Sequence, residues 1–171
     1  MRGLTQDLAT FVSRLDFGDI PPQACDTIKI GFIDCLGVLV PGQAEDAPKI
    51  VQQTLESADA AEKASLIPSR IKLNADLAAL VNGVAAHVLD YDDVTLDGHP
   101  SAVLVPAILA QAEACGANGR DMMVAYAAGY ETWCELLIRE PIPLYAKGWH
   151  PTATRGTVAA AAACARLMKL D

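Results

Sequence analysis

The segment PTATRGTVAAAAACARLMKLD, which closes the chain from Pro151 to Asp171, constrains the fold more than any other stretch. Alanine has the highest helix propensity of all residues, so the segment predicts a helix over about residues 151–168. Small apolar side chains over two of its turns suit burial between other helices. We expect a partner chain or further sequence to cover this helix, with packing against the earlier helices as the alternative.

The rest of the chain repeats the helical pattern. Apolar residues with helical spacing predict helices over residues 4–15, 22–40, 47–57, 100–114 and 120–138, and another from Asn74 through ADLAALVNGVAAHVL. Pro22 suits the first turn of its helix, and the PG pair at 41 and 42 is expected to end it. The intervening ADAAEKASLIPSRIKL predicts a loop with at most one short strand, near residues 65–67. No alternating pattern of useful length occurs, so the predicted fold is an all-α, multi-helix domain.

Charge and cysteine content exclude several classes of function. Thirteen basic and twenty-one acidic residues give a net charge of −8, without the concentrated basic face that nucleic-acid binding needs. The apolar runs are too short to span a bilayer, and we expect no secretory signal, because Asp7 occurs before an apolar region forms. The five cysteines show no C-x-x-C pair and lie in apolar helical stretches, which predicts reduced, buried thiols in a cytoplasmic protein.

Two of the three histidines share one local setting. His99 lies in DYDDVTLDGHPSA and His150 in GWHPTA, and each is followed by Pro, Ser or Thr, and Ala. Proline at the first helical position forces the residue before it out of the α region, so both histidines are expected at helix N-termini. Such an end attracts anions, and a histidine there can act as acid, base or hydrogen-bond donor. Two such ends predict a polycarboxylate site; the alternative is that each histidine only caps its helix.

The aspartates beside His99 allow a second interpretation, a metal site. Hard cations bind oxygen ligands at close spacing, but this pattern lacks the central glycine and terminal glutamate of an EF-hand loop. We therefore expect no metal; the first aspartate should end a helix and point into a pocket, while the other three face solvent or bond the backbone. These residues are, in order, Asp90, Asp92, Asp93 and Asp97. His87, one helical turn earlier, is expected to be a packed, hydrogen-bonded core residue rather than a catalyst.

Four segments resemble, in the same order, segments of the MmgE/PrpD family, which includes 2-methylcitrate dehydratase and cis-aconitate decarboxylase. They are NGVAAHVLDYDD, GHPSAVLVPAILAQAE, AYAAGYETW and KGWHPTATRGTVAAAAACARL, and the resemblance covers essentially the whole chain. It implies that residues 1–171 form the amino-terminal part of an incomplete helical domain, without the family's smaller α/β lid. It also implies a reaction without metal or organic cofactor, at a carbon next to a carboxylate.

The resemblance assigns roles to particular residues. It implies catalytic roles for Asp90, His99 and His150, while the basic residues and the tyrosine that complete the family site lie in later sequence. We expect substrate contacts from the hydroxyl side chains of the same stretches, Thr95, Ser101 and Thr152. Several family members have threonine where this chain has Val94, so Thr95 is expected to substitute and the identity of the substrate stays open.

The leading hypothesis is a cofactor-independent lyase of the 2-methylcitrate dehydratase type that acts on a small di- or tricarboxylic acid. A decarboxylase or epimerase of a related diacid is the alternative within the family. From another class, the chain is an inactive helical module that assembles with a longer relative. We expect a homodimer or association with the remainder of the enzyme, and little activity from these 171 residues alone.

Overall fold

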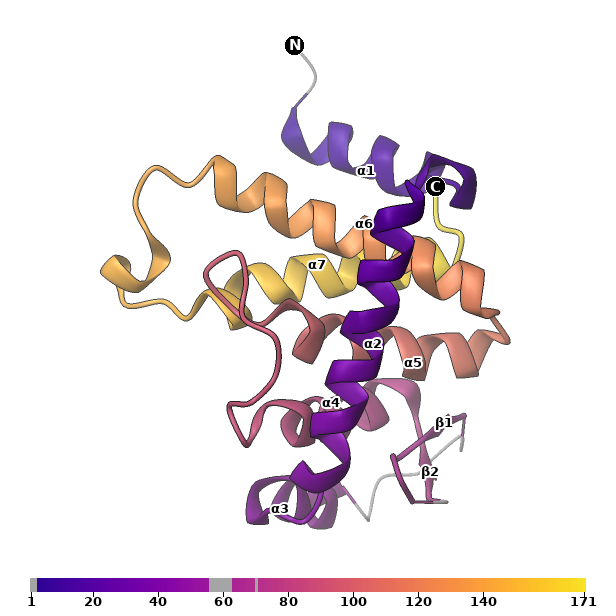
Figure 1. Cartoon of the computed structure of the whole chain (residues 1–171), viewed down its shortest axis with the longest axis vertical. Coiled ribbons are helices and arrows are strands. Elements are labelled where there is room, and N and C mark those ends of the chain that lie inside the picture. Colours follow the sequence, from indigo (N-terminus) through magenta and orange to yellow (C-terminus); the bar gives the residue numbers. More distant parts are fainter. Residues whose placement is uncertain (1–2, 56–62, 70) are drawn as a thin grey trace.

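The structure is a computed structural model that describes residues 3–55, 63–69 and 71–171. Within these residues the fold consists of seven α-helices, two short 3₁₀ helices and one two-stranded antiparallel sheet (Figure 1). The helices are α1 (Leu4–Arg14), η1 (Phe17–Asp19), α2 (Pro22–Gly42), α3 (Asp46–Leu55), α4 (Ala75–His87), α5 (Pro100–Cys115), α6 (Gly119–Ile138), η2 (Leu144–Lys147) and α7 (Pro151–Leu167). The strands are β1 (Ala64–Ser65) and β2 (Lys72–Leu73). The predicted all-α class is confirmed.

The helices pack around α5. It contacts α4 on one side and α7 on the other, α6 packs against α7, and α2 crosses in front of this stack to contact α4, α5 and α6 (Figure 1). Leu39, Leu104, Ile108 and Trp133 are fully buried where these helices meet. Because α5 is covered on several sides, it carries apolar residues around most of its surface, as its sequence AVLVPAILA indicates.

The final helix is covered by the chain itself. α7 packs against α1, α5 and α6, and it buries Ala159, Ala163 and Leu167. At its end, the Arg166 guanidinium donates two hydrogen bonds to the Leu15 carbonyl at 3.0 and 2.8 Å. The earlier helices therefore cover this face of α7, which was the alternative to a partner chain.

The second helix ends at the glycine of the PG pair, two residues later than the predicted end at residue 40. α2 continues through Pro41 to Gly42, because the hydrogen bond that proline removes falls in the last turn. Gly42 instead allows close packing between α2 and α4: a Cβ there would lie 1.9 Å from the Ala85 carbonyl oxygen. Close packing against α4 therefore requires a glycine at the position where α2 ends.

The region expected to hold at most one short strand forms two. Ala64 pairs with Leu73 and Ser65 with Lys72. The Glu113 carboxylate on α5 accepts hydrogen bonds from the Ser65 backbone at 2.7 Å and from Lys72 Nζ at 2.8 Å, so it ties both strands to the helix. Residues 56 and 57 of the helix predicted over 47–57 lie outside the described residues.

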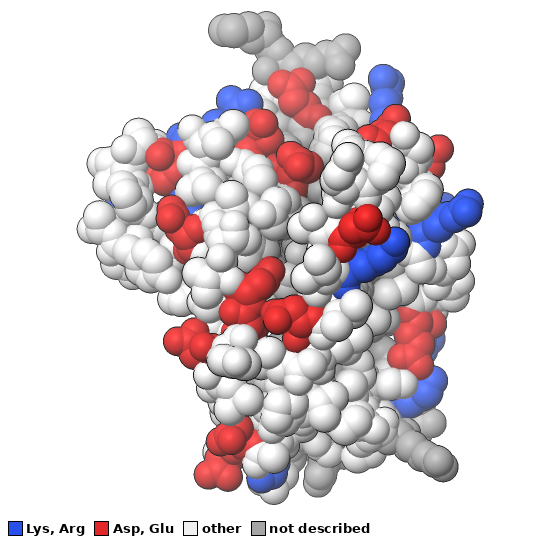
Figure 2. Space-filling view, in the orientation of Figure 1, with Lys and Arg blue, Asp and Glu red and all other residues white. Residues whose placement is uncertain are grey.

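The structure also bears on the predictions about membrane-spanning helices, buried cysteines and surface charge. None of the helices in the described ranges combines the length and apolar character that a membrane crossing requires. All five cysteines are free thiols; Cys35 is buried, but Cys115 is exposed because it lies in the last turn of α5. Figure 2 shows acidic side chains scattered over one face, with fewer basic ones between them and no basic patch.

Candidate active site

The loop between α4 and α5, residues 88–99, has an unusual backbone. Thr95 and Gly98 exchange two backbone hydrogen bonds of 3.0 Å across a two-residue turn. The turn residues, Leu96 and Asp97, have φ angles of 53° and 60°, and Asp90 has 49°. A tight hairpin turn of this kind requires positive φ at both central positions, where asparagine and glycine are the usual residues. A leucine there costs about 1–3 kcal/mol, so other contacts must hold the loop.

Two buried side chains hold this turn from outside the loop. The Leu96 carbonyl accepts hydrogen bonds from Trp133 Nε1 on α6 at 3.1 Å and from Arg155 Nη1 on α7 at 3.4 Å. Gly98 packs so closely that an added Cβ would lie 2.9 Å from both Thr152 Oγ1 and the Trp133 ring. Contacts from α6 and α7 therefore position the loop that leads into His99.

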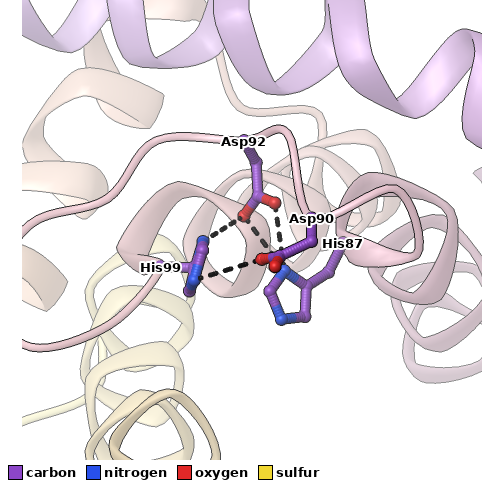
Figure 3. A group of neighbouring side chains, drawn as sticks. All are labelled: His87, Asp90, Asp92 and His99. Atoms are coloured by element: carbon purple, nitrogen blue, oxygen red, sulfur yellow. Dashed lines mark hydrogen bonds and ion pairs between the residues drawn. The ribbon is translucent and has the colours of Figure 1, made fainter.

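A cluster of histidines and aspartates lies where this loop meets α4 (Figure 3). Asp92 places Oδ1 3.0 Å from His87 Nδ1 and Oδ2 3.1 Å from His99 Nδ1. His99 Nε2 lies 3.6 Å from Asp90 Oδ1. The ring of His87 lies 4.4 Å from that of His99 and 6.4 Å from that of His150, centre to centre. All three histidines of the chain thus come together.

The two histidines that were predicted at helix N-termini do lie there. His99 is the N-cap residue of α5 and His150 that of α7, and a proline follows each as the first helical residue. The His99 backbone N–H donates to Thr152 Oγ1 at 3.2 Å, so the two H-P-[S/T]-A stretches are in direct contact. His150 is exposed and packs edge-on against Tyr145 at 5.7 Å.

The aspartates differ from the expected arrangement. Asp90 does not end a helix: α4 stops at His87, and the Asp90 side chain is 81% exposed, although it reaches His99. Asp92 was expected to face solvent or bond the backbone, yet its side chain is fully buried between two histidines. The reason is the loop backbone, whose left-handed residue at 90 turns the next aspartates inward. Asp97 is exposed, as expected, and its Oδ2 lies 3.8 Å from Arg155 Nη1.

His87 is more than a packed core residue. Its side chain is one-third exposed and lines a groove of about 750 Å³ between α4, α5 and α7. Thr152 and Thr157 line the same groove, whose other walls are mainly alanines, valines and a leucine. Among the described residues, those that line the groove include no lysine or arginine, so no permanently charged cation there can pair with an anionic ligand.

The other two predicted substrate contacts lie elsewhere. Ser101 is fully buried: its Oγ donates to Asp93 Oδ2 at 2.6 Å and accepts from the Tyr126 hydroxyl at 2.7 Å. Thr95 lines a separate cavity of about 560 Å³ between α2 and α6, together with Asp93 and Tyr126. In this arrangement Ser101 fixes the loop to the core, and neither hydroxyl is part of the histidine cluster.

Burial changes the acidity of this network. It raises the pKa of Asp93 above its ordinary 3.8, although the Ser101 hydrogen bonds act in the opposite direction. Burial likewise raises the pKa of the Tyr126 hydroxyl and that of the Cys35 thiol. Both of these groups therefore stay protonated near neutral pH.

A pH-dependent stability follows from Asp93. Because its pKa is higher in the folded state, its contribution to the free energy of unfolding is present at low pH and falls as the pH rises above about 3.8. We expect Asp93→Asn to gain stability relative to the unmodified protein between pH 4 and pH 7. Urea denaturation across this range measures the difference, with the exposed Asp26→Asn as a control. A constant difference at every pH would contradict the prediction.

The cluster contains the donor types of a metal site. One nitrogen or oxygen each from His87, Asp90, Asp92 and His99 lies within 4.8 Å of the others. In the structure, however, these atoms already pair with one another, carboxylate to imidazole. The arrangement fits proton transfer equally well, because imidazoles held by carboxylates can accept and donate protons near neutral pH.

The chain is similar to a known protein family and to several known proteins. Residues 6–171 match the MmgE/PrpD N-terminal domain. The chain is 29% identical over 179 residues to human (Homo sapiens) cis-aconitate decarboxylase, a match that covers 100% of this chain and 37% of that protein. It is 34% identical over 103 residues to the Mus musculus cis-aconitate decarboxylase, covering 55% of this chain and 20% of that protein. It is 25% identical over 178 residues to the cis-aconitate decarboxylase-like protein oryM of Aspergillus oryzae, covering 98% and 37%. The chain thus spans little more than a third of the human protein's length.

Proposed function

The chain belongs to the MmgE/PrpD family, and on this premise we propose that it forms one wall of the active site of a lyase for small di- or tricarboxylic acids. The observation that carries the proposal is the convergence of all three histidines with Asp90 and Asp92 beside an apolar groove. Groups that exchange protons near neutral pH are what a reaction at a carbon next to a carboxylate requires.

In the proposed dehydration, a base of the cluster removes a proton from the carbon beside a carboxylate. A carbon–carbon double bond forms as the hydroxyl leaves from the next carbon, and an acid of the cluster protonates it to water. Asp90 and His99, which face each other at 3.6 Å, are proposed to handle the proton, and His150 to orient a carboxylate or protonate the leaving group. The scheme uses no metal and no organic cofactor.

Decarboxylation is the second candidate, favoured by the names of the similar proteins, which are cis-aconitate decarboxylases or a decarboxylase-like protein. Here the bond between a carbon and its carboxylate breaks, carbon dioxide leaves, and a proton from the cluster replaces it. Epimerisation, in which one carbon loses and regains a proton, needs the same groups. Val94, which is exposed in the loop, offers no hydroxyl for telling these substrates apart.

The proposal requires positive charge from outside the groove. A substrate with two or three carboxylates approaches a chain of net charge −8, and a helix N-terminus supplies only about half a charge. We propose that the cations come from other parts of the enzyme or from a second copy. The exposed Ile30 and Ile33 on α2 form an apolar surface that supports such association.

A product assay tests the proposal. Protein expressed from its full reading frame is incubated with 2-methylcitrate or cis-aconitate, and the products are separated by chromatography while released carbon dioxide is measured. Loss of water without carbon dioxide supports the dehydratase, and carbon dioxide release supports the decarboxylase. If neither acid is converted and related diacids show neither change nor inversion, the lyase proposal fails and the inactive assembly module remains.

A further inference from the structure

Asp92 occupies a position that the proposed reaction does not yet use. Its side chain is fully buried, whereas Asp90, two residues earlier, is 81% exposed. Each Asp92 oxygen faces a different imidazole: Oδ1 lies 3.0 Å from His87 Nδ1, and Oδ2 lies 3.1 Å from His99 Nδ1 (Figure 3). A carboxylate without solvent contact and with one histidine on each oxygen cannot bind substrate itself.

The two contacts differ in geometry. The bond from His87 Nδ1 meets hydrogen-bond geometry, at 3.0 Å to Oδ1 and 3.3 Å to Oδ2. The contact from His99 Nδ1 has the distance of an ion pair but misses the angle of a hydrogen bond, so this buried nitrogen has no hydrogen-bond partner. The attraction at His99 is therefore electrostatic, and a small rotation of the ring would complete the hydrogen bond.

The chemistry of the carboxylate fixes where the ring protons lie. An ionised carboxylate only accepts hydrogen bonds, and a bare Nδ1 lone pair this close to it would be repelled. Both Nδ1 atoms must therefore carry the proton, which leaves the Nε2 atoms of the neutral rings free to accept one. His99 Nε2 also faces a carboxylate, but Asp90 is farther away, at 3.6 Å, and its side chain is 81% exposed, so solvent screens this contact. The contact with the buried Asp92, at 3.1 Å, therefore decides which nitrogen of His99 carries the proton. Figure 3 shows the second ring nitrogen of His87 turned away from Asp92.

We propose that Asp92 is a positioning residue that holds His87 and His99 together, with both Nδ1 protons turned inward and both Nε2 atoms presented to the site. This inference rests on the proposed function and deepens it, because it brings His87 into the site as a second proton-accepting imidazole. His87 already lines the groove, and its ring lies 4.4 Å from that of His99. One buried carboxylate thus sets the orientation of two rings.

Nuclear magnetic resonance of ¹⁵N-histidine-labelled protein tests the inference without any substrate. The nitrogen shifts separate protonated from bare ring nitrogens, and removal of each histidine in turn assigns the signals. In the unmodified protein at a pH where the rings are neutral, we expect the Nδ1–H form at His87 and His99. The Nε2–H form at either ring would overturn the inference, whatever the activity.

Asp92→Asn sharpens the test while keeping the side-chain shape. The amide replaces one carboxylate oxygen by an NH₂ donor, so one of the two rings must turn a bare nitrogen towards it. We expect one ring, His87 or His99, to change to the Nε2–H form and His150 to keep its signal. The exposed Asp76→Asn on α4 is the matched control and should leave all three unchanged. No change in Asp92→Asn would overturn the inference.

Kinetics distinguish a positioning role from a purely structural one. We expect Asp92→Asn to lower kcat about 10- to 100-fold with KM nearly unchanged, by analogy with carboxylates that orient metal-bound histidines. Altered ring protonation with unchanged kcat would overturn the positioning role. If the unmodified protein converts no acid, the proposed function fails, but the nitrogen spectra still decide whether Asp92 holds the rings.

Discussion

His99→Ala is expected to lower the kcat of the protein about 10²- to 10⁴-fold, the usual contribution of a group that transfers a proton in the transition state. His99 is placed for this role by the N-terminus of α5, by Asp92 at one ring nitrogen and by Asp90 at the other. Steady-state turnover of the acid identified by the product assay measures the loss.

His99→Gln distinguishes the loss of proton transfer from the loss of a polar side chain at this position. Glutamine keeps a polar side chain but cannot take up a proton near neutral pH, so it should lose nearly as much activity as alanine. Urea denaturation must show that both variants remain folded, and Asp76→Asn, at the far end of α4 on an exposed position, serves as the unchanged control. Turnover within two-fold of the unmodified protein for both variants would remove His99 from the mechanism.

Structural features that depend only on neighbouring residues could be predicted from the sequence. Proline after histidine fixes both residues at the start of a helix, whatever the rest of the fold does, and His99 and His150 are both N-cap residues. The helices were likewise predictable, because each is a long segment with apolar residues at helical spacing. The predicted and observed helices differ at their ends, as at Gly42, where α2 runs two residues beyond the predicted end.

The sequence did not predict that Asp90 is exposed and Asp92 buried. Side-chain direction in the loop depends on three non-glycine residues with positive φ, and nothing in DYDDVTLDG signals that conformation. The contacts that impose it come from α6 and α7, more than thirty residues later in the chain. The spacing of His87 and Asp92 was the one available signal, since a histidine at the end of a helix can reach an acidic residue in the loop that follows.

The same dependence makes Trp133 a sensitive position for stability. Its side chain is fully buried, and its indole N–H donates to the Leu96 carbonyl of the strained turn. We expect Trp133→Ala to lower the free energy of unfolding by about 3–5 kcal/mol, because the variant leaves a large cavity beside α7. Urea denaturation followed by circular dichroism measures it.

A second variant and a matched control distinguish the stability lost to the cavity from the stability lost with the hydrogen bond. Trp133→Phe keeps most of the ring but loses the donor, so it should cost less, about 1–3 kcal/mol, with Arg155 still bonded to Leu96. Trp149, the other tryptophan, is 60% exposed, and Trp149→Ala should change stability by no more than about 0.5 kcal/mol. Because the turn at Leu96 leads into His99, the phenylalanine variant should also lower kcat while remaining folded. Full activity in that variant would show that the loop keeps its conformation without the indole, and that the buried packing alone holds the site.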